Sequence, residues 1–431
     1  GKTVQVLSYL LAMKQNGQTL PSLIVCPASL VLNWAEECQK FTPELSCVVV
    51  DGDAAHRAEL AESWPAADLV VTSYDLLRRD EALYEGQEFY ACILDEAQAI
   101  KNHTTQKYKA VCKVRSRVRF ALTGTPVENR LGELWSIFSF LMPGYLPPYK
   151  SFCSRFEKPI VQEEDQTAVR RLNQLTGPFI LRRMKSDVLK ELPPKTENVY
   201  RIELEEEQRK LYLAAVVDAR EKLQAAKPED KMAVFAVLMR LREICCDPRL
   251  IADNWEGGSA KLDACAELVS SAVEGGHRIL LFSQFTSMLE LLAKRLDAEG
   301  ISHFTLQGST PKPVRAELVR RFNGGEVSVF LISLRAGGTG LNLTAADIVI
   351  HYDPWWNVAA QNQATDRAYR IGQQNPVQVY KLIAQDTIEE KIVELQQAKQ
   401  SLADTVTGTA DGAILSMRPD ELLQLLEGSE P

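Results

Sequence analysis

Ile93-Leu94-Asp95-Glu96-Ala97-Gln98 is the stretch that decides the fold when it is taken together with the start of the chain, Gly1-Lys2-Thr3. The first stretch is an apolar strand that ends in two adjacent carboxylates. The second matches the end of a phosphate-binding loop, in which Lys reaches the outer phosphates, Thr holds Mg²⁺ and a helix N-terminus receives the anion. Only the last Gly of such a loop is present and no Met starts the chain, so we expect a fragment that begins inside the loop. Together the two stretches predict a nucleotide-hydrolysis site.

Length and composition set the broad class of the protein. The 431 residues are 45% hydrophobic and 25% charged, which is typical of a globular chain with a large core in two domains. No apolar run approaches the roughly eighteen residues needed to cross a bilayer, and no signal peptide is visible. We therefore expect no membrane partner and a cytoplasmic location, associated with the nucleoid if the protein is bacterial.

Cysteine content and net charge disfavour other classes. The nine cysteines are odd in number and include no C-x-x-C pair, so we expect buried reduced thiols rather than a disulfide framework or a zinc site. The net charge of −8 argues mildly against a chain coated in basic surface. Affinity for phosphates depends on local fields, however, so a cleft that binds nucleic acid is compatible with this charge.

Short β-branched runs alternate with helical stretches in two series. The first series comprises Leu23–Cys26, Cys47–Val50, Leu69–Thr72, Ala91–Leu94 and Phe120–Leu122. The second comprises Arg278–Phe282, His303–Leu306, Val327–Ile332, Ile348–His351 and Val377–Leu382. Because strands that alternate with helices form βαβ units, each series predicts a parallel sheet covered on both faces. The predicted fold class is α/β, with two parallel-sheet lobes.

The two series of predicted strands divide the chain into four segments. Residues 1–126 form the first lobe, and residues 260–402 form the second lobe, which ends in a helix from Thr387. Residues 127–259 lack the strand rhythm and carry helix-compatible patterns such as Leu211 to Ala219, so we expect helical insertions and a linker there. Residues 403–431 form a C-terminal tail.

Asp95 and Glu96 are the principal catalytic candidates. They end an apolar strand, where neighbouring side chains can enter the crevice used by open α/β sheets. One carboxylate can hold Mg²⁺, and the other can orient or deprotonate the attacking water. For these two residues alone, a solvated pair at a strand end is the commoner finding, but Lys2 and Thr3 favour the catalytic interpretation.

Two turns that follow strands can also meet phosphates. Leu122-Thr123-Gly124-Thr125-Pro126 carries two hydroxyls, which either report the state of a phosphate through hydrogen bonds or belong to an ordinary strand exit. In the turn Ser333–Leu343, glycines that include Gly338 and Gly340 permit an unusual turn or close approach of the backbone to a ligand. The first turn is weak evidence by itself, whereas the second gains weight from its place between a strand and a helix-like run.

Arg367 and Arg370 are three residues apart, and they share one face if their segment is helical. Their guanidiniums stay protonated and their planar forks suit phosphate oxygens, so they fit arginine fingers. Such fingers are worth about a thousandfold or more in rate. The alternative is a solvated pair with Asp366 nearby, which is the commoner fate of helical arginines.

The order of these motifs resembles that of superfamily-two helicase-like ATPases and, within them, the Swi/Snf-type family of DNA translocases and remodellers. In the first lobe, the segments similar to motifs Ia, Ib, II and III are Cys26–Trp34, Thr72–Tyr74, Asp95–Gln98 and Leu122–Pro126. In the second lobe, Phe282–Phe285 is similar to motif IV, the Gly-rich turn to motif V and the arginine segment to motif VI. Leu181–Val188 resembles a segment particular to this family. Gln98 and Tyr369 stand where His is common, which looks more like bacterial members.

The resemblance implies two RecA-like lobes of the P-loop NTPase type, with ATP and Mg²⁺ as cofactors between them. The catalytic residues would be Asp95, Glu96, Arg367 and Arg370, and Thr3 and Asp95 would hold the metal. The nucleotide would contact Gly1, Lys2, Thr3, Gln98, Gly338 and Gly340. Closure of the lobes would complete the site, and hydrolysis would separate them again.

The resemblance also implies translocation on double-stranded DNA, held through its backbone and therefore without sequence readout. The positions that match DNA contacts are Ser29, Asn33, Thr72, Ser73, Arg182, Arg183, Lys185, Ser283 and Gln284. A solvated patch is an equal alternative for the Arg182–Lys185 cluster. DNA-bound proteins or RNA polymerase are the expected targets. Two other functions stay open: a strand-separating helicase for DNA or RNA, and a scaffold that lacks catalysis because its phosphate-binding loop is incomplete.

Overall fold

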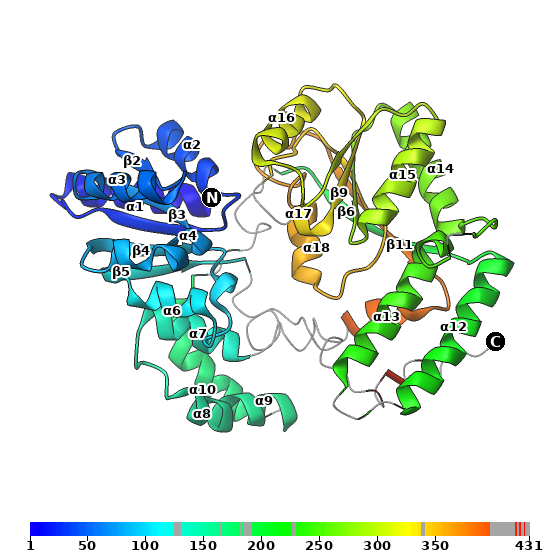
Figure 1. The fold of residues 1–431 in the computed structure, drawn as a ribbon, viewed down its shortest axis with the longest axis horizontal. Coiled ribbons are helices and arrows are strands. Elements are labelled where there is room, and N and C mark those ends of the chain that lie inside the picture. The colour runs from blue at the N-terminus through cyan, green and yellow to red at the C-terminus, as the bar shows by residue number, and fades with distance from the viewer. Residues whose placement is uncertain are drawn as a thin grey trace. The chain divides into compact units, whose positions relative to one another are not determined.

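Two parallel β-sheets organise the chain (Figure 1). The computed structural model describes residues 1–124, 131–163, 165–181, 183, 192–225, 227, 230–252, 254–337, 341–396, 419, 422, 423 and 426. These residues separate into two units, Gly1–Leu181 and a second that begins after it, and each unit contains one sheet. The predicted α/β fold class with two parallel-sheet lobes is therefore confirmed.

The first sheet contains the strands predicted from the first series of β-branched runs. Its order is β2-β3-β1-β4-β5, and every neighbouring pair is parallel. The strands are β1 (Ser22–Cys26), β2 (Cys47–Val49), β3 (Leu69–Ser73), β4 (Glu88–Asp95) and β5 (Arg115–Leu122). β1 and β3 are buried at every position, as expected for inner strands of a sheet with helices on both faces.

Two apolar cores lie on opposite faces of this sheet, because successive strand residues such as Ile24 and Val25 point in opposite directions. One core includes Leu7 and Trp34 from α1 and α2, and the other includes Tyr74 and Val111 from α4 and α6. The helices of the unit are α1 (Lys2–Gln15), α2 (Val31–Phe41), α3 (Ala54–Ser63), α4 (Tyr74–Arg79), α5 (Glu81–Tyr84), α6 (Gln106–Lys113), α7 (Leu131–Leu141), α8 (Tyr149–Phe152), α9 (Lys158–Gln162) and α10 (Gln166–Thr176). Helices α7, α8 and α10 also share a small core of their own.

The second sheet has the order β6-β11-β10-β7-β9-β8 and is likewise parallel. Its strands are β6 (Lys195–Ile202), β7 (Ile279–Ser283), β8 (His303–Leu306), β9 (Val329–Ser333), β10 (Ile348–His351) and β11 (Val377–Ala384). The inner strands β7, β9 and β10 are fully buried. Because all the strands are parallel, their carboxyl ends lie at the same edge of the sheet. Ligands of such sheets bind at this edge.

Helices again cover both faces of the sheet (Figure 1). Helices α14 (Ala260–Glu274) and α15 (Thr286–Ala298) pack on one face. The opposite face carries α16 (Lys312–Asn323), α17 (Leu334–Gly337) and α18 (Val358–Thr365). Helices α12 (Glu206–Ala225) and α13 (Lys231–Cys246) form a further core with Trp356 and Ile388. No helix in the described ranges is long and apolar enough to span a membrane.

One expectation about secondary structure is wrong, and the condition under which Arg367 and Arg370 would share a helical face is not met. The segment 127–259 is not purely helical, because β6 lies within it and pairs with β11; α12 does confirm the helical pattern around Leu211. The arginine segment is not helical either, because α18 ends at Thr365 and Arg367 lies in the turn that follows. The carbonyl of Arg367 accepts the N–H of Leu343 over 3.0 Å, which draws this backbone into a tertiary contact rather than a further helical turn.

Candidate functional site

Lys2 and Thr3 lie in the first turn of a helix, as their predicted role requires. Helix α1 begins at Lys2, and Gly1 is its N-cap. Lys2 is exposed and Thr3 is half-buried. The N–H groups and the positive dipole end of a first helical turn favour an anion, so these residues stand where a phosphate would be held.

Asp95 is a buried carboxylate at the end of β4. Trp34 donates its Nε1–H to Oδ2 over 3.0 Å, and the N–H of Glu96 donates to Oδ1 over 2.9 Å. In the described part of the chain, Asp95 forms no salt bridge. Burial and the charge of Glu96 raise the pKa of Asp95, while Lys2 and the Trp34 hydrogen bond act in the opposite direction. The structure therefore keeps a costly negative charge in place with neutral donors.

Glu96 has a strained backbone beside this carboxylate. Its φ of 48° lies in the left-handed region, which costs a non-Gly residue about 1–3 kcal/mol and often marks a functional site. Gln98 donates Nε2–H to Oε2 of Glu96 over 2.7 Å, and Thr123 donates its hydroxyl to Oε1 of Gln98 over 2.9 Å. Gln98, for which a nucleotide contact was predicted, thus bridges Glu96 to the turn after β5.

The donor set around Asp95 suits a magnesium ion bound together with a nucleotide. Among the described residues, no group of three or more His, Cys, Asp or Glu side chains is arranged to hold a metal ion. Mg²⁺ commonly uses one or two carboxylates and completes its coordination with water and substrate phosphates. Asp95 and the hydroxyl of Thr3 are ligands of this type, and Lys2 lies close enough to affect the Asp95 pKa.

The predicted DNA contacts of the first unit are only partly accessible. Ser29 and Asn33 are half-buried, and Nδ2 of Asn33 donates to Glu37 over 3.3 Å. Thr72 and Ser73 are buried at the end of β3; Thr72 accepts the hydroxyl of Tyr84, and Ser73 caps α4. Ser29 and Asn33 are therefore better placed to meet a ligand directly, while Thr72 and Ser73 support the local structure.

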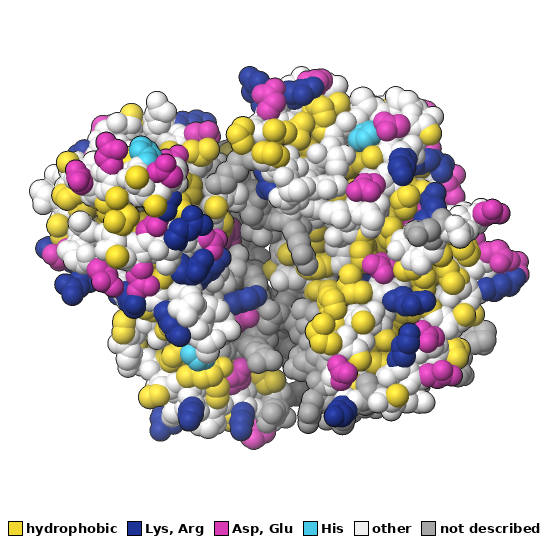
Figure 2. All heavy atoms as spheres, viewed as in Figure 1, with side chains coloured by type: hydrophobic (Ala, Val, Ile, Leu, Met, Phe, Trp, Pro, Cys, Tyr) yellow, Lys and Arg dark blue, Asp and Glu magenta, His cyan; other side chains and the backbone are white. Residues whose placement is uncertain are grey.

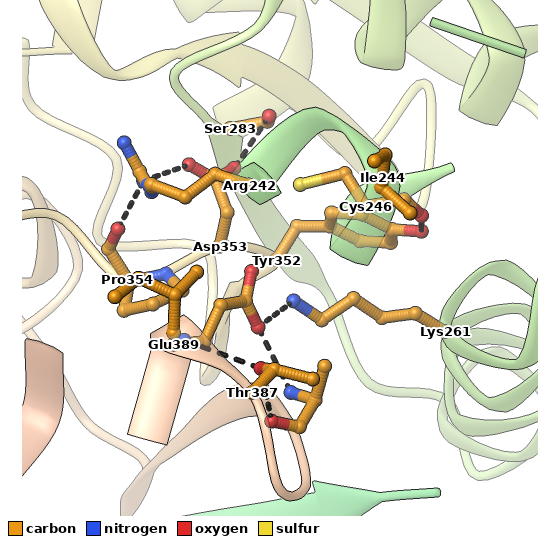
Figure 3. A network of polar contacts seen from close by, with 12 residues as sticks. Arg242, Ile244, Cys246, Lys261, Ser283, Tyr352, Asp353, Pro354, Thr387 and Glu389 are labelled. Atoms are coloured by element: carbon orange, nitrogen blue, oxygen red, sulfur yellow. Dashed lines mark hydrogen bonds and ion pairs between the residues drawn. The ribbon is translucent and has the colours of Figure 1, made fainter. Parts of the chain in front are cut away.

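The two predicted contacts after β7 also differ from each other. Ser283 is buried and donates its hydroxyl to Oδ1 of Asp353 over 2.6 Å (Figure 3). The backbone N–H of Gln284 donates to the same oxygen over 3.2 Å. Its side-chain Nε2, in contrast, is buried and has no hydrogen-bond partner in the described structure. Gln284 as a whole is half-buried, so its side chain is more accessible than that of Ser283, which holds the turn.

Two buried ion pairs were not foreseen from the sequence, one of which supports this turn (Figure 3). Arg242 of α13 lies 3.3 Å from Asp353 and also donates to the carbonyl of Pro354. Lys261 of α14 pairs with Glu389, and both side chains are fully buried. The only signal in the sequence is the presence of charges within apolar helices, such as Arg242 in the run Lys231–Cys246. Their partners are more than a hundred residues away, so spacing alone does not identify them.

Arg367 and Arg370 lie beyond the end of α18 and face different surroundings. Arg367 is buried, and Arg370 is half-buried and donates to the carbonyl of Leu341 over 3.2 Å. Arg183 is exposed. The other predicted site residues, Arg182, Lys185, Gly338 and Gly340, lie outside the described residues, as do Thr125 and Pro126.

The visible surface carries no single-sign face that would point to nucleic acid by charge alone. Figure 2 shows Lys and Arg side chains interspersed with Asp and Glu over both units, among the described residues of that view. This mixture agrees with the net charge of −8. On this face, a contact with a phosphate backbone would therefore depend on local groups.

Two family models match the chain. The SNF2-related domain matches residues 1–250, which include Lys2, Asp95 and Glu96, and the helicase conserved C-terminal domain matches residues 260–372. The first match covers more than half of the sequence. The chain belongs to the SNF2-related family. The resemblance inferred from the order of the motifs is thereby confirmed.

Individual SNF2 relatives are similar over nearly the whole chain. The putative ATP-dependent helicase/translocase YwqA of Bacillus subtilis is 39% identical over 99% of this chain and 47% of its own length. The TATA-binding protein-associated factor MOT1 of Saccharomyces cerevisiae is 34% identical over 95% of this chain and 25% of its own length. The SWI2/SNF2 ATPase core of Sulfolobus solfataricus, solved with dsDNA, is 35% identical over 98% of this chain and 89% of that chain, with a TM-score of 0.47. The chain thus spans less than half the length of these two curated relatives.

Proposed function

We propose that this SNF2-related chain is the motor of an ATP-hydrolysing enzyme that moves along double-stranded DNA and rearranges proteins bound to it. The observation that carries the proposal is the buried Asp95 carboxylate, which neutral donors hold beside the strained Glu96 and in the field of Lys2. The names of the relatives, a helicase/translocase and a factor associated with TATA-binding protein, support the DNA part. A cytoplasmic location, with nucleoid association in a bacterium, belongs to the same proposal.

In this proposal each of the predicted site residues has one task in ATP hydrolysis. Lys2 binds the outer phosphates, and Thr3 and Asp95 hold Mg²⁺, which stabilises negative charge on the phosphoryl oxygens when bound. Glu96 orients the attacking water and accepts its proton, and Gln98 fixes the Glu96 carboxylate through the 2.7 Å hydrogen bond. Arg367 and Arg370 add positive charge for the phosphoryl oxygens.

Duplex DNA is held through its backbone in the same proposal. The candidates for such contacts are the residues whose side chains are at least partly accessible, namely the half-buried Ser29, Asn33 and Gln284 and the exposed Arg183. Phosphate contacts carry no base information, so binding should be independent of sequence and should weaken as salt rises. The buried Thr72, Ser73 and Ser283 act by holding these segments in place.

The test is ATP turnover by the full-length protein with and without duplex DNA. We expect duplex to raise turnover severalfold and Glu96→Gln to stop turnover while nucleotide binding remains. Glu62→Gln, at an exposed position of α3, is the matched control and should behave as wild type. A turnover that does not respond to duplex, or that survives in Glu96→Gln, would overturn the proposal.

Strand separation is the second candidate function, because YwqA is named both helicase and translocase. A fluorescence assay on blunt and tailed duplexes of DNA and RNA distinguishes the two. Translocation without unwinding leaves the strands paired while ATP is consumed, whereas release of a labelled strand at a comparable rate favours a strand-separating enzyme.

A further inference from the structure

Trp34 connects a predicted DNA-contacting helix to the metal-binding carboxylate. Its indole is 1% exposed and packs in the core between the sheet and helices α1 and α2. Its Nε1–H donates to Oδ2 of Asp95 over 3.0 Å, although the two residues are 61 positions apart. Asn33, one of the predicted DNA contacts, is its immediate neighbour on α2. A displacement of this part of α2 therefore acts directly on the carboxylate.

Tyr74 makes a second connection of the same kind. It is buried directly after Ser73, at the start of α4, and its hydroxyl donates to the backbone carbonyl of Asp95 over 2.9 Å. Trp34 thus holds the side chain of Asp95, and Tyr74 holds its backbone. The two donors come from opposite faces of the sheet, since Trp34 and Tyr74 belong to different apolar cores.

The chemistry of these donors suits a positioning role. The N–H groups of Trp34 and Glu96 each occupy one carboxylate oxygen, which fixes the orientation of the group but leaves lone pairs for a cation. A Lys or Arg partner would instead cancel the charge that a metal ion needs. Hydrogen bonds that orient a metal ligand commonly matter about 10- to 100-fold for metal affinity or activity.

We propose that Trp34 and Tyr74 are positioning residues for the metal-binding carboxylate of Asp95, and that Trp34 transmits engagement of the accessible segment around Asn33 to it. This inference rests on the proposed function and assigns its regulation: binding of duplex beside Asn33 orients, through Trp34, the carboxylate on which hydrolysis depends, while Tyr74 fixes the backbone of Asp95. Neither residue touches a substrate atom in this scheme. Their effect is exerted through Asp95 alone.

Trp34→Phe in the full-length protein tests the inference, because it removes the N–H donor and retains an aromatic ring. Trp64→Phe is the matched control: Trp64 is also fully buried in the first unit, but its Nε1 has no hydrogen-bond partner in the described structure. Tyr74→Phe is the second variant, which removes one hydroxyl and keeps the ring. Two quantities are measured: Mn²⁺ bound to the ADP-loaded protein, counted by electron paramagnetic resonance, and the ratio of duplex-stimulated to basal ATP turnover.

We expect Trp34→Phe to weaken Mn²⁺ binding about tenfold and to lower the stimulation ratio about fivefold or more. Tyr74→Phe should weaken Mn²⁺ binding in the same direction, because it removes the hydrogen bond to the Asp95 carbonyl, and Trp64→Phe should match wild type. If Trp34→Phe and Tyr74→Phe match Trp64→Phe in both measurements, the inference is wrong. If wild-type turnover does not respond to duplex, the proposed function fails and transmission fails with it, but a selective loss of Mn²⁺ affinity still supports Trp34 as a positioning residue.

Discussion

Two buried aspartates, one in each unit, stand at the carboxyl ends of inner strands, and their partners differ. Asp95 ends β4 and is 8% exposed, and Asp353 follows β10 and is 5% exposed. Burial raises the pKa of both carboxyls. Asp353 is paired with the guanidinium of Arg242, whereas Asp95 is held by N–H donors and forms no salt bridge among the described residues.

In the proposed function, this difference separates an architectural carboxylate, Asp353, from a metal-binding one, Asp95. A buried charge is costly unless it is paired and hydrogen-bonded. Arg242 supplies the pairing for Asp353 within the folded chain, so that carboxylate organises the turn that carries Ser283. Asp95 lacks such a partner and remains available to a cation from outside. The comparison therefore supports the proposed metal site on physical grounds, independently of any relative.

Asp95→Asn gives the largest expected effect and the sharpest test of the comparison. Loss of the proposed metal-binding carboxylate removes several kcal/mol of transition-state stabilisation, so ATP turnover should fall about a thousandfold. The free energy of unfolding should stay constant or rise, because the raised pKa of Asp95 means that its charged form destabilises the fold near neutral pH. Steady-state turnover and urea unfolding measure the two quantities.

Asp353→Asn is the matched control, since it makes the same change at the paired aspartate. It leaves Arg242 buried without its counter-charge, so stability should fall. The distinction between the two aspartates fails if Asp95→Asn destabilises the protein as much as Asp353→Asn does.

Arg242→Met tests the other half of the comparison. Asp353 would then remain buried without its counter-charge, and the free energy of unfolding should fall by about 3–5 kcal/mol. The double variant Arg242→Met/Asp353→Leu should recover much of this loss, because it removes the uncompensated charge as well. Urea unfolding of the single and double variants measures the coupling. A single-variant loss below about 1 kcal/mol would place the pair among weak surface-like ion pairs.

The sequence was sufficient for the sheets and for the motifs at their edges. The predicted strands correspond to β1–β5 and β7–β11, because buried parallel strands are continuous apolar, β-branched runs. β6 was not predicted, because Lys195–Ile202 is an edge strand in which only Ile202 is buried, and it lacks a continuous apolar run. Its strand conformation depends on pairing with β11, about which its own residues say little.

The contacts that distinguish the site residues were not accessible from the sequence. Motif positions suggested that Ser283 and Gln284 act alike, but their different roles depend on Asp353, which is some seventy positions away. The spacing of Arg367 and Arg370 is compatible with a helix, but it did not establish one. A backbone contact with Leu343 overrides that local pattern. In both cases the outcome depends on contacts with residues distant in the sequence, and not on the local helix or strand propensity.

His351 extends the comparison to acid stability. It is buried at the end of β10, 2.8 Å from Oγ1 of Thr365, whereas the first-unit residues His56 and His103 are not buried. Burial lowers the pKa of His351 from 6.5 to about 3. The folded state keeps the ring neutral and the unfolded chain binds the extra proton, so this contribution to stability is complete above pH 6.5 and is lost as the pH falls toward 3.

His351→Gln should remove this part of the acid response. Between pH 6.5 and 5.5, wild type should lose about 1 kcal/mol of unfolding free energy that the variant does not lose. Urea unfolding at a series of pH values gives the slope, and His56→Gln, at an exposed position, should keep the wild-type slope. Equal slopes for His351→Gln and wild type would show that His351 is not the group that titrates.

Ser283→Ala and Gln284→Ala give the smallest effects and divide neighbouring residues between the two roles. Ser283 donates to Asp353, so its loss should cost about 1 kcal/mol of stability and change duplex affinity little. Gln284 is half-buried and its Nε2 has no partner in the described structure, so Gln284→Ala should change stability by no more than about 0.5 kcal/mol while duplex affinity falls a fewfold. Urea unfolding and fluorescence anisotropy with labelled duplex at fixed salt measure both. If Ser283→Ala weakens duplex binding as much as Gln284→Ala at unchanged stability, the hydroxyl must reach the DNA, and burial against Asp353 is then a poor guide to which polar groups serve the ligand.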